Sequence, residues 1–185
     1  MCWWRLWRRL GIKTAFVLDH HFEDRIRGRF LKLISHIERC TYAGFAVLAL
    51  DCLLIETLQQ FRKGVPRTPF RQSEAFFACF LTETSFGSYF DEEMAKMFYK
   101  QIRCGILHQA EVEGNSRVLI RKDIPLVKYT DDRKGLVINR KLFHQQLMRE
   151  FEAYIARLRE KSNQELRNRF KTKMDYICRV SGGTG

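Results

Sequence analysis

Hydrophobic residues recur every three or four positions along most of this chain, which is the period of an amphipathic α-helix. The first clear stretch covers residues 19–37 and has arginines and lysines between its apolar positions. The second, residues 41–62, is apolar nearly all round for its first three turns. Such a helix belongs at the centre of a bundle, although it carries two acids, Asp51 and Glu56.

The helical period returns in three later stretches. Residues 73–86 predict a short apolar helix, and residues 91–110 predict a longer one that begins at Asp91. Residues 140–159 predict the last long helix, which begins after Asn139. Both Asp91 and Asn139 can cap their helices, because their side-chain oxygens can accept hydrogen bonds from the free N–H groups of the first turn.

The pattern changes between the last two of these helices. Short β-rich runs at residues 117–121, 126–129 and 136–138 are separated by turn sequences, which predicts two or three strands. We therefore predict a mainly α protein. Its fold is a four- to five-helix bundle with a small antiparallel β insert, at about 117–138, before the last long helix.

Length and composition set the domain organisation. The chain has 185 residues, of which 45% are hydrophobic, and this suits one well-buried domain and excludes wholesale disorder. We predict a helical domain over residues 19–160. A basic, Trp-rich segment (1–18) precedes it, and a basic extension with a flexible tail (161–185) follows it.

The formal net charge of +12 predicts attraction to polyanions, which include nucleic acid, an anionic membrane and an acidic partner. The basic extension is either a solvated tail or a contact for RNA. Its candidate RNA-binding residues are Arg167, Arg169, Lys171 and Lys173.

Two further features concern where the protein works. Trp3, Trp4 and Trp7 interleave with arginines, so this segment can lie on a membrane surface, although we favour packing against the domain or a second subunit. The 6 cysteines include no C-x2-C pair, which is not typical of a zinc site or a disulfide framework. They indicate reduced thiols in a cytoplasmic protein, and we expect no metal and no cofactor.

Arg103 and His108 are the polar exceptions in an apolar part of the 91–110 helix. A buried cation without a partner is costly, so Arg103 needs either a partner or a function. We interpret Asp51 and Glu56 as buried acids that pair with arginine or lysine. A sharper hypothesis is that one of them orients Arg103 or His108, and the plainer alternative is that His108 is a hydrogen-bonded structural residue.

This layout resembles the HEPN superfamily (higher eukaryote and prokaryote nucleotide-binding domains) over roughly residues 20–160. The resemblance is carried by Arg103-Cys-Gly-Ile-Leu-His108, with Phe98-Tyr99 before it and Gln109-Ala110 after it. The segments Ile55-Glu56-Thr-Leu and Val137-Ile-Asn139-Arg-Lys-Leu-Phe-His144 add support. Ala110 stands where one subgroup has a tyrosine that a nucleotidyltransferase modifies, so we expect no such partner.

The resemblance implies a metal-independent endoribonuclease that acts in phage defence or in a toxin–antitoxin system, where an inhibitor or antitoxin protein is a possible partner. Arg103 would hold the scissile phosphate, and His108 would take the proton from a ribose 2′-OH. The products would be a 2′,3′-cyclic phosphate and a 5′-OH end. Many active members have a polar residue where this chain has Cys104, which leaves room for a catalytically silent HEPN module that binds RNA, a nucleotide or a protein. A membrane-surface effector is a third alternative.

Helix geometry adds a constraint on Arg103 and His108. Five residues at about 100° each place them about 140° apart around an ideal helix, so one helix does not present both on one face. The resemblance implies a homodimer, in which an isologous contact brings both pairs into one composite site. The residues expected to support or line this site are Asp51, Glu56, Tyr99, Lys100, Cys104 and Gln109.

Overall fold

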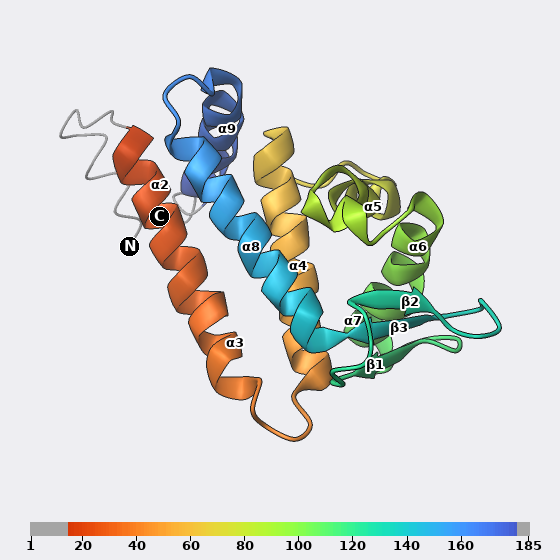
Figure 1. Cartoon of the computed structure of the whole chain (residues 1–185). Coiled ribbons are helices and arrows are strands. Elements are labelled where there is room, and N and C mark those ends of the chain that lie inside the picture. Colours follow the sequence, from red (N-terminus) through yellow and green to blue (C-terminus); the bar gives the residue numbers. More distant parts are fainter. Residues whose placement is uncertain (1–14, 181–185) are drawn as a thin grey trace.

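The computed structural model describes residues 15–180. The chain is mainly helical, with a small sheet before the last two long helices, which confirms the predicted fold class (Figure 1). The predictions for the three tryptophans and for the flexible tail concern residues 1–14 and 181–185, which lie outside the described residues.

The first half of the chain forms a helical hairpin. Its first arm is continuous and consists of α2 (Ala15–Ile26), the π-helical η1 (Arg27–Leu31) and α3 (Lys32–Ile37). Its second arm is α4 (Gly44–Lys63), which ends where Gly64 takes a left-handed conformation with φ +67°. Residues with a side chain rarely adopt this φ, so glycine is the natural stop for α4 at this point.

The middle of the chain crosses α4 on one side. It comprises α5 (Ser73–Glu83), the short 3-10 helix η2 (Ser85–Ser88) and a continuous rod made of α6 (Glu92–Met97), the π-helical η3 (Phe98–Cys104) and α7 (Gly105–Gln109). The Asp91 side chain accepts a hydrogen bond of 2.7 Å from the Met94 amide, which confirms the predicted cap. Phe98 stacks on Phe143 with ring centroids 5.0 Å apart, and this contact fixes η3 on the core.

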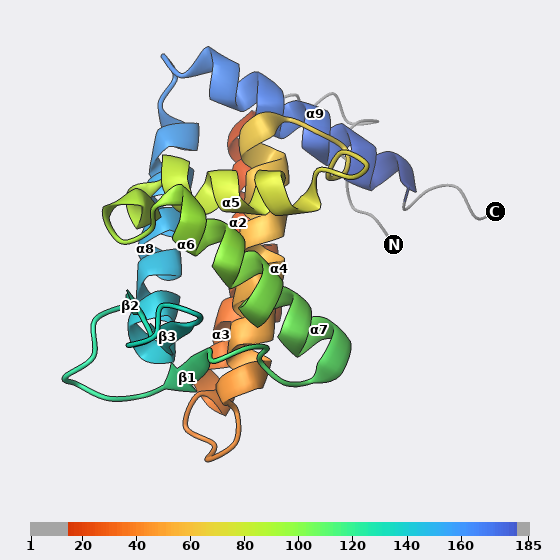
Figure 2. The same cartoon turned by 90° about the vertical axis from the view of Figure 1, so that its right-hand side faces the viewer.

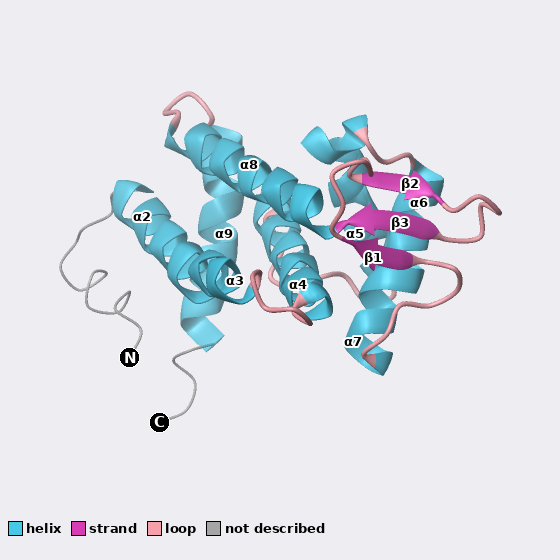
Figure 3. Cartoon of the chain, turned by 60° about the horizontal axis from the view of Figure 1, so that its bottom comes forward, coloured by secondary structure: helices cyan, strands magenta, loops and turns pink. Residues whose placement is uncertain are grey.

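The β insert is a three-stranded sheet whose strands are β1 (Arg117–Leu119), β2 (Val127–Tyr129) and β3 (Leu136–Asn139), in the order β1-β3-β2 (Figure 3). The β2–β3 pair is antiparallel as predicted, but β1 pairs with β3 in parallel, so the sheet is mixed. The Asn139 amide explains this difference, because it donates to the carbonyls of Arg121 and Ile124 and holds the β1–β2 connection across the end of β3.

Two long helices follow the sheet. The first, α8 (Arg140–Arg159), has the predicted bounds and the predicted Asn139 cap. The second, α9 (Gln164–Val180), crosses the end of α4 (Figure 2), whereas we predicted a basic extension outside the domain from residue 161. Its Phe170, Met174 and Cys178 are buried in the core at four-residue spacing. This narrow apolar stripe lies among many cations. The pattern of the sequence therefore predicts a polar extension and not a core helix.

Helix α4 is the centre of the fold and contacts α3, α5, α7, α8 and α9. By length and hydropathy it is also the one described helix that could cross a membrane. Its buried residues, which include Leu48, Leu54, Ile55 and Leu58, belong to the main core cluster. This is the environment of a core helix, and the cytoplasmic location remains a prediction.

Candidate functional site

Arg103 lies in the π-helical segment η3, between the buried Ile102 and the half-buried Cys104. Its Nη2 donates to Oε2 of Glu56 on α4 over 2.9 Å, and its guanidinium lies 5.4 Å from the centroid of the Tyr99 ring. Glu56, and not Asp51, is therefore the acid that orients Arg103. π-Helical turns are rare and are found frequently at functional sites.

The surroundings of Arg103 keep its charge. Burial lowers the pKa of Arg103, but the hydrogen bond and charge of Glu56 outweigh this effect, and the net pKa is raised. The side chain is 16% exposed, and its Nε is buried without a hydrogen-bond partner among the described residues. The guanidinium is a permanent cation held by one carboxylate at the edge of the core.

His108 lies in the last turn of α7 and is exposed. η3 ends at Cys104 and α7 begins at Gly105, so most of the step from Arg103 to His108 is ordinary α-helix, and the π-helical segment does not bring the two side chains onto one face. Gly105, the first residue of α7, lies close to the chain that follows the helix. A Cβ at this position would lie 2.5 Å from the Glu111 carbonyl oxygen, so glycine allows the chain to fold back against the helix.

The other residues expected near the pair divide into two groups. Tyr99 and Cys104 are half-buried beside Arg103, and burial raises the pKa of the Tyr99 hydroxyl. Lys100 and Gln109 are exposed and have partners elsewhere: Lys100 pairs with Glu74 at 3.4 Å, and Gln109 donates to Glu113 over 2.7 Å.

Asp51 lies away from the pair. Its Oδ1 is 2.7 Å from Nδ1 of His144 on α8, and both side chains are buried. Burial raises the pKa of Asp51, although the hydrogen bond with His144 and the charges of His144 and Arg140 offset part of this rise. His144 has no motif context in the sequence, so the sequence analysis did not identify this dyad.

The loop after α4 also reaches the site. Oε1 of Glu56 accepts a hydrogen bond of 3.1 Å from the hydroxyl of Thr68, while Oε2 holds Arg103. Thr68 lies between Arg67 and Pro69 in the sequence. A loop that contains proline is therefore attached to the same carboxylate as Arg103. Nothing in the sequence pattern pointed to Thr68.

The four cations predicted to bind RNA on α9 are mostly engaged within the protein. Arg169 pairs with Glu165, Lys171 with Asp175 at 3.3 Å, and Arg167 donates to the Leu158 carbonyl. Lys173 is buried and donates to Gln60 and to the Pro66 carbonyl. Burial and the neighbouring Arg67 and Arg25 lower the pKa of Lys173 to about 8.

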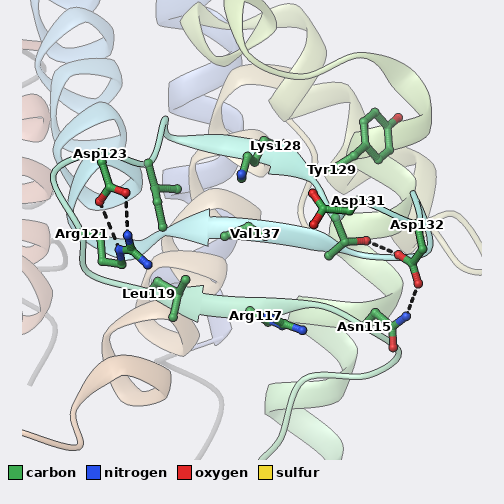
Figure 4. Close-up of a pocket in the computed structure, with 12 residues that line it drawn as sticks. Asn115, Arg117, Leu119, Arg121, Asp123, Lys128, Tyr129, Asp131, Asp132 and Val137 are labelled. Carbon is green, nitrogen blue, oxygen red and sulfur yellow. Dashed lines mark hydrogen bonds and ion pairs between the residues drawn. The ribbon is translucent and has the colours of Figure 1, made fainter.

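The open face of the sheet forms a hollow of about 480 Å³ (Figure 4). Arg117 and Lys128 flank Val137 in register across the three strands. The cations and acids that line the hollow balance: they are Arg117, Arg121, Lys128, Asp123, Asp131 and Asp132. Because the cations and acids of this lining are equal in number, the hollow has no excess positive charge to attract an anionic substrate.

Comparisons of the chain with protein-family models, with curated proteins and with solved structures give no match. The site must therefore be judged on its own chemistry. A permanently charged guanidinium with a fixed orientation can bind a phosphate, and an exposed imidazole can exchange a proton near neutral pH.

Proposed function

We propose that this protein is a metal-independent endoribonuclease of the HEPN type. Arg103 binds the scissile phosphate, and His108 transfers the proton. RNA is the substrate, and phage defence or a toxin–antitoxin system is the proposed setting. The observation that carries the proposal is the arginine held by Glu56 at 2.9 Å in a π-helical turn, with the exposed His108 on the helix that continues it.

The proposed reaction needs only these groups and the RNA. His108 removes the proton from a ribose 2′-OH, and the 2′-oxygen forms a bond to the adjacent phosphorus. The bond from phosphorus to the 5′-oxygen breaks, and that oxygen takes the proton back from His108, so the step balances. Arg103 stabilises the charge that develops on the phosphoryl oxygens, because its planar donors match them. The products are a 2′,3′-cyclic phosphate and a 5′-OH end.

A second copy of the chain is part of the proposal. Leu53 on α4 is 44% exposed and lies one turn before Glu56, and Leu107 beside His108 is 43% exposed. Residues three apart on a helix share a face, so Leu53 and Glu56 point the same way. A symmetric contact over these two leucines would place two Arg103 and two His108 side chains in one cleft.

The first experiment is RNA cleavage in EDTA, followed by identification of the new 3′ ends. We expect wild type to leave 2′,3′-cyclic phosphates. We expect His108→Ala and Arg103→Ala each to reduce the rate about 100-fold or more. His36→Ala is the matched control, because His36 is also an exposed helical histidine. Absence of cleavage by wild type, or equal rates for the variants, would contradict the proposal.

Mixing the two inactive variants tests the composite site. If each site takes Arg103 from one subunit and His108 from the other, a mixed dimer contains one intact site and regains activity. If both residues act within one chain, mixing restores nothing. RNA binding by wild type without any cleavage would instead favour the catalytically silent module, for which Cys104 beside Arg103 is the relevant departure.

A further inference from the structure

The loop that joins α4 to α5, residues 64–72, carries four features that the proposed reaction does not use. Phe70 is 85% exposed, and the Arg71 guanidinium lies 5.1 Å from the centroid of its ring. Arg71 has φ +58°, a left-handed conformation that a residue with a side chain rarely adopts. Such backbone strain clusters at binding and catalytic sites. On the same loop, the Arg67 guanidinium lies 5.7 Å from the centroid of the Tyr176 ring on α9.

The 64–72 loop is held in place on both sides of Arg67. The Thr68 hydroxyl donates to Glu56 over 3.1 Å and accepts from Gln60 over 3.0 Å. The Pro66 carbonyl accepts from the buried Lys173. These anchors fix the loop beside the carboxylate that orients Arg103. Phe70, two residues after Thr68, is therefore presented to solvent by a loop that is attached to the candidate site.

The charge around Phe70 favours an anionic ligand. Between Glu56 and Glu74 the sequence contains Arg62, Lys63, Arg67 and Arg71 and no acid. Arg62 and Lys63 pair with Glu150 and Glu83, but Arg71 has no acidic partner among the described residues. The loop thus offers one exposed aromatic ring with an uncompensated guanidinium beside it.

Phe70 is the one exposed large apolar residue on the 64–72 loop, which narrows the class of ligand further. The other exposed large apolar residues of the described chain lie on other elements, at positions 33, 42, 53, 89, 107, 120 and 142. A protein interface needs a continuous apolar patch, whereas a nucleobase needs a single flat ring. Proteins that hold single-stranded nucleic acid combine aromatic rings, on which bases stack, with cations that contact the backbone.

We propose that Phe70 and Arg71 form a stacking subsite for an unpaired RNA base, next to the Arg103 phosphate site. Phe70 stacks on the base, and Arg71 contacts the phosphate beside it. The substrate is therefore single-stranded at this nucleotide. The inference rests on the proposed ribonuclease function and adds to it the class of RNA and the residues that position it.

The test uses single-stranded RNA oligonucleotides with one cleavage position and a single abasic nucleotide placed at each neighbouring position in turn. We expect Phe70→Ala to reduce kcat/KM on intact RNA by about fivefold or more, and Phe70→Trp to retain activity. We expect one abasic position to reduce kcat/KM of wild type by the same factor. At that position the abasic nucleotide should not reduce kcat/KM of Phe70→Ala below its value on intact RNA. Tyr42→Ala is the matched control, because Tyr42 is 95% exposed on a different loop.

The outcomes separate this inference from the proposed function. If wild type cleaves no RNA, the proposed function fails. If wild type cleaves and Phe70→Ala cleaves equally well, the stacking subsite is wrong and the function stands. Three other results would also overturn the subsite. The first is that each abasic position reduces kcat/KM of Phe70→Ala by the same factor as that of wild type. The second is rapid cleavage of fully paired RNA, and the third is a change in the oligomer mass of Phe70→Ala. Circular dichroism of each variant shows whether the fold is retained.

Discussion

Helix α4 carries two acids that lie five residues apart and have opposite surroundings. Asp51 faces α8, where it is fully buried and hydrogen-bonded to His144 over 2.7 Å. Glu56 faces η3, where its side chain is 26% exposed and holds Arg103 at 2.9 Å. Five residues turn an α-helix by about 140° beyond a full turn, so the two carboxylates point to different neighbours.

The difference between these pairs separates a buried structural pair from the pair proposed to be functional. Asp51 and His144 are closed off from solvent, so a substrate cannot reach them without opening the bundle. Glu56 is linked on one oxygen to Arg103 and on the other to Thr68 of the exposed 64–72 loop. Two acid–base pairs of similar chemistry on one helix thus differ in access, and access is what a catalytic site requires.

The largest expected effect is on stability at the buried pair. Asp51→Ala removes one partner and leaves His144 in the core without its hydrogen bond. A buried polar group left without its partner costs about 1–3 kcal/mol, and more where the group is charged. We expect urea unfolding to show a loss of this size in the free energy of unfolding, with His144→Ala similarly destabilised.

His108→Ala is the matched control for the buried histidine. His108 is exposed, and surface substitutions usually change stability by about 0.5 kcal/mol or less. A loss at His108 equal to the loss at His144 would mean that the burial of His144 beside Asp51 adds nothing to stability. A small loss at both Asp51 and His144 would mean that the dyad is not structural.

The sequence allowed much of this architecture to be predicted, but not the partners of the polar residues. Local signals located α8 and the caps at Asp91 and Asn139, because a cap depends on a side chain and its own first turn. The direction of β1 depends on contacts made by Asn139 with residues 121 and 124, which no local pattern encodes. The apolar stripe of α9 was hidden among its cations.

At the candidate site too, local features could be predicted from the sequence and tertiary contacts could not. The Arg103–His108 spacing is visible in the sequence, and Glu56 was one of two acids considered as its partner. The choice between Asp51 and Glu56 depends on which helix packs on which face of α4. The π-helical turn at Arg103 comes from a shift in backbone hydrogen bonding, and the exposure of Phe70 comes from how the 64–72 loop is anchored.

The second expected effect is a pH dependence of the buried pair. Burial raises the pKa of Asp51 above its ordinary value of 3.8, and His144 and Arg140 only partly oppose it. Because the folded state keeps this proton to a higher pH than the unfolded chain, the stability it contributes is fully present below pH 3.8. It is lost as the pH rises through the folded pKa.

Asp51→Asn tests this sign, because asparagine does not titrate. The free energy of unfolding of wild type minus that of Asp51→Asn should fall as the pH rises from the ordinary pKa of aspartate through the folded one, and should then become constant. Urea unfolding of both proteins at a series of acidic pH values gives this difference. A difference that increases with pH would mean that the folded protein favours the charged carboxylate.

The smallest effect on stability is expected at the open pair. Glu56→Gln removes the charge and leaves one amide oxygen, which can accept from Arg103 while the NH2 group takes the place of the oxygen that accepts from Thr68. Ion pairs near the surface contribute about 1 kcal/mol or less. The effect on cleavage should be larger, about tenfold, because Arg103 and the 64–72 loop are then held less firmly. Unfolding and RNA cleavage measured on the same preparation compare the two. A large loss of stability with unchanged cleavage would make Glu56 a second structural acid, and the contrast with Asp51 would no longer hold.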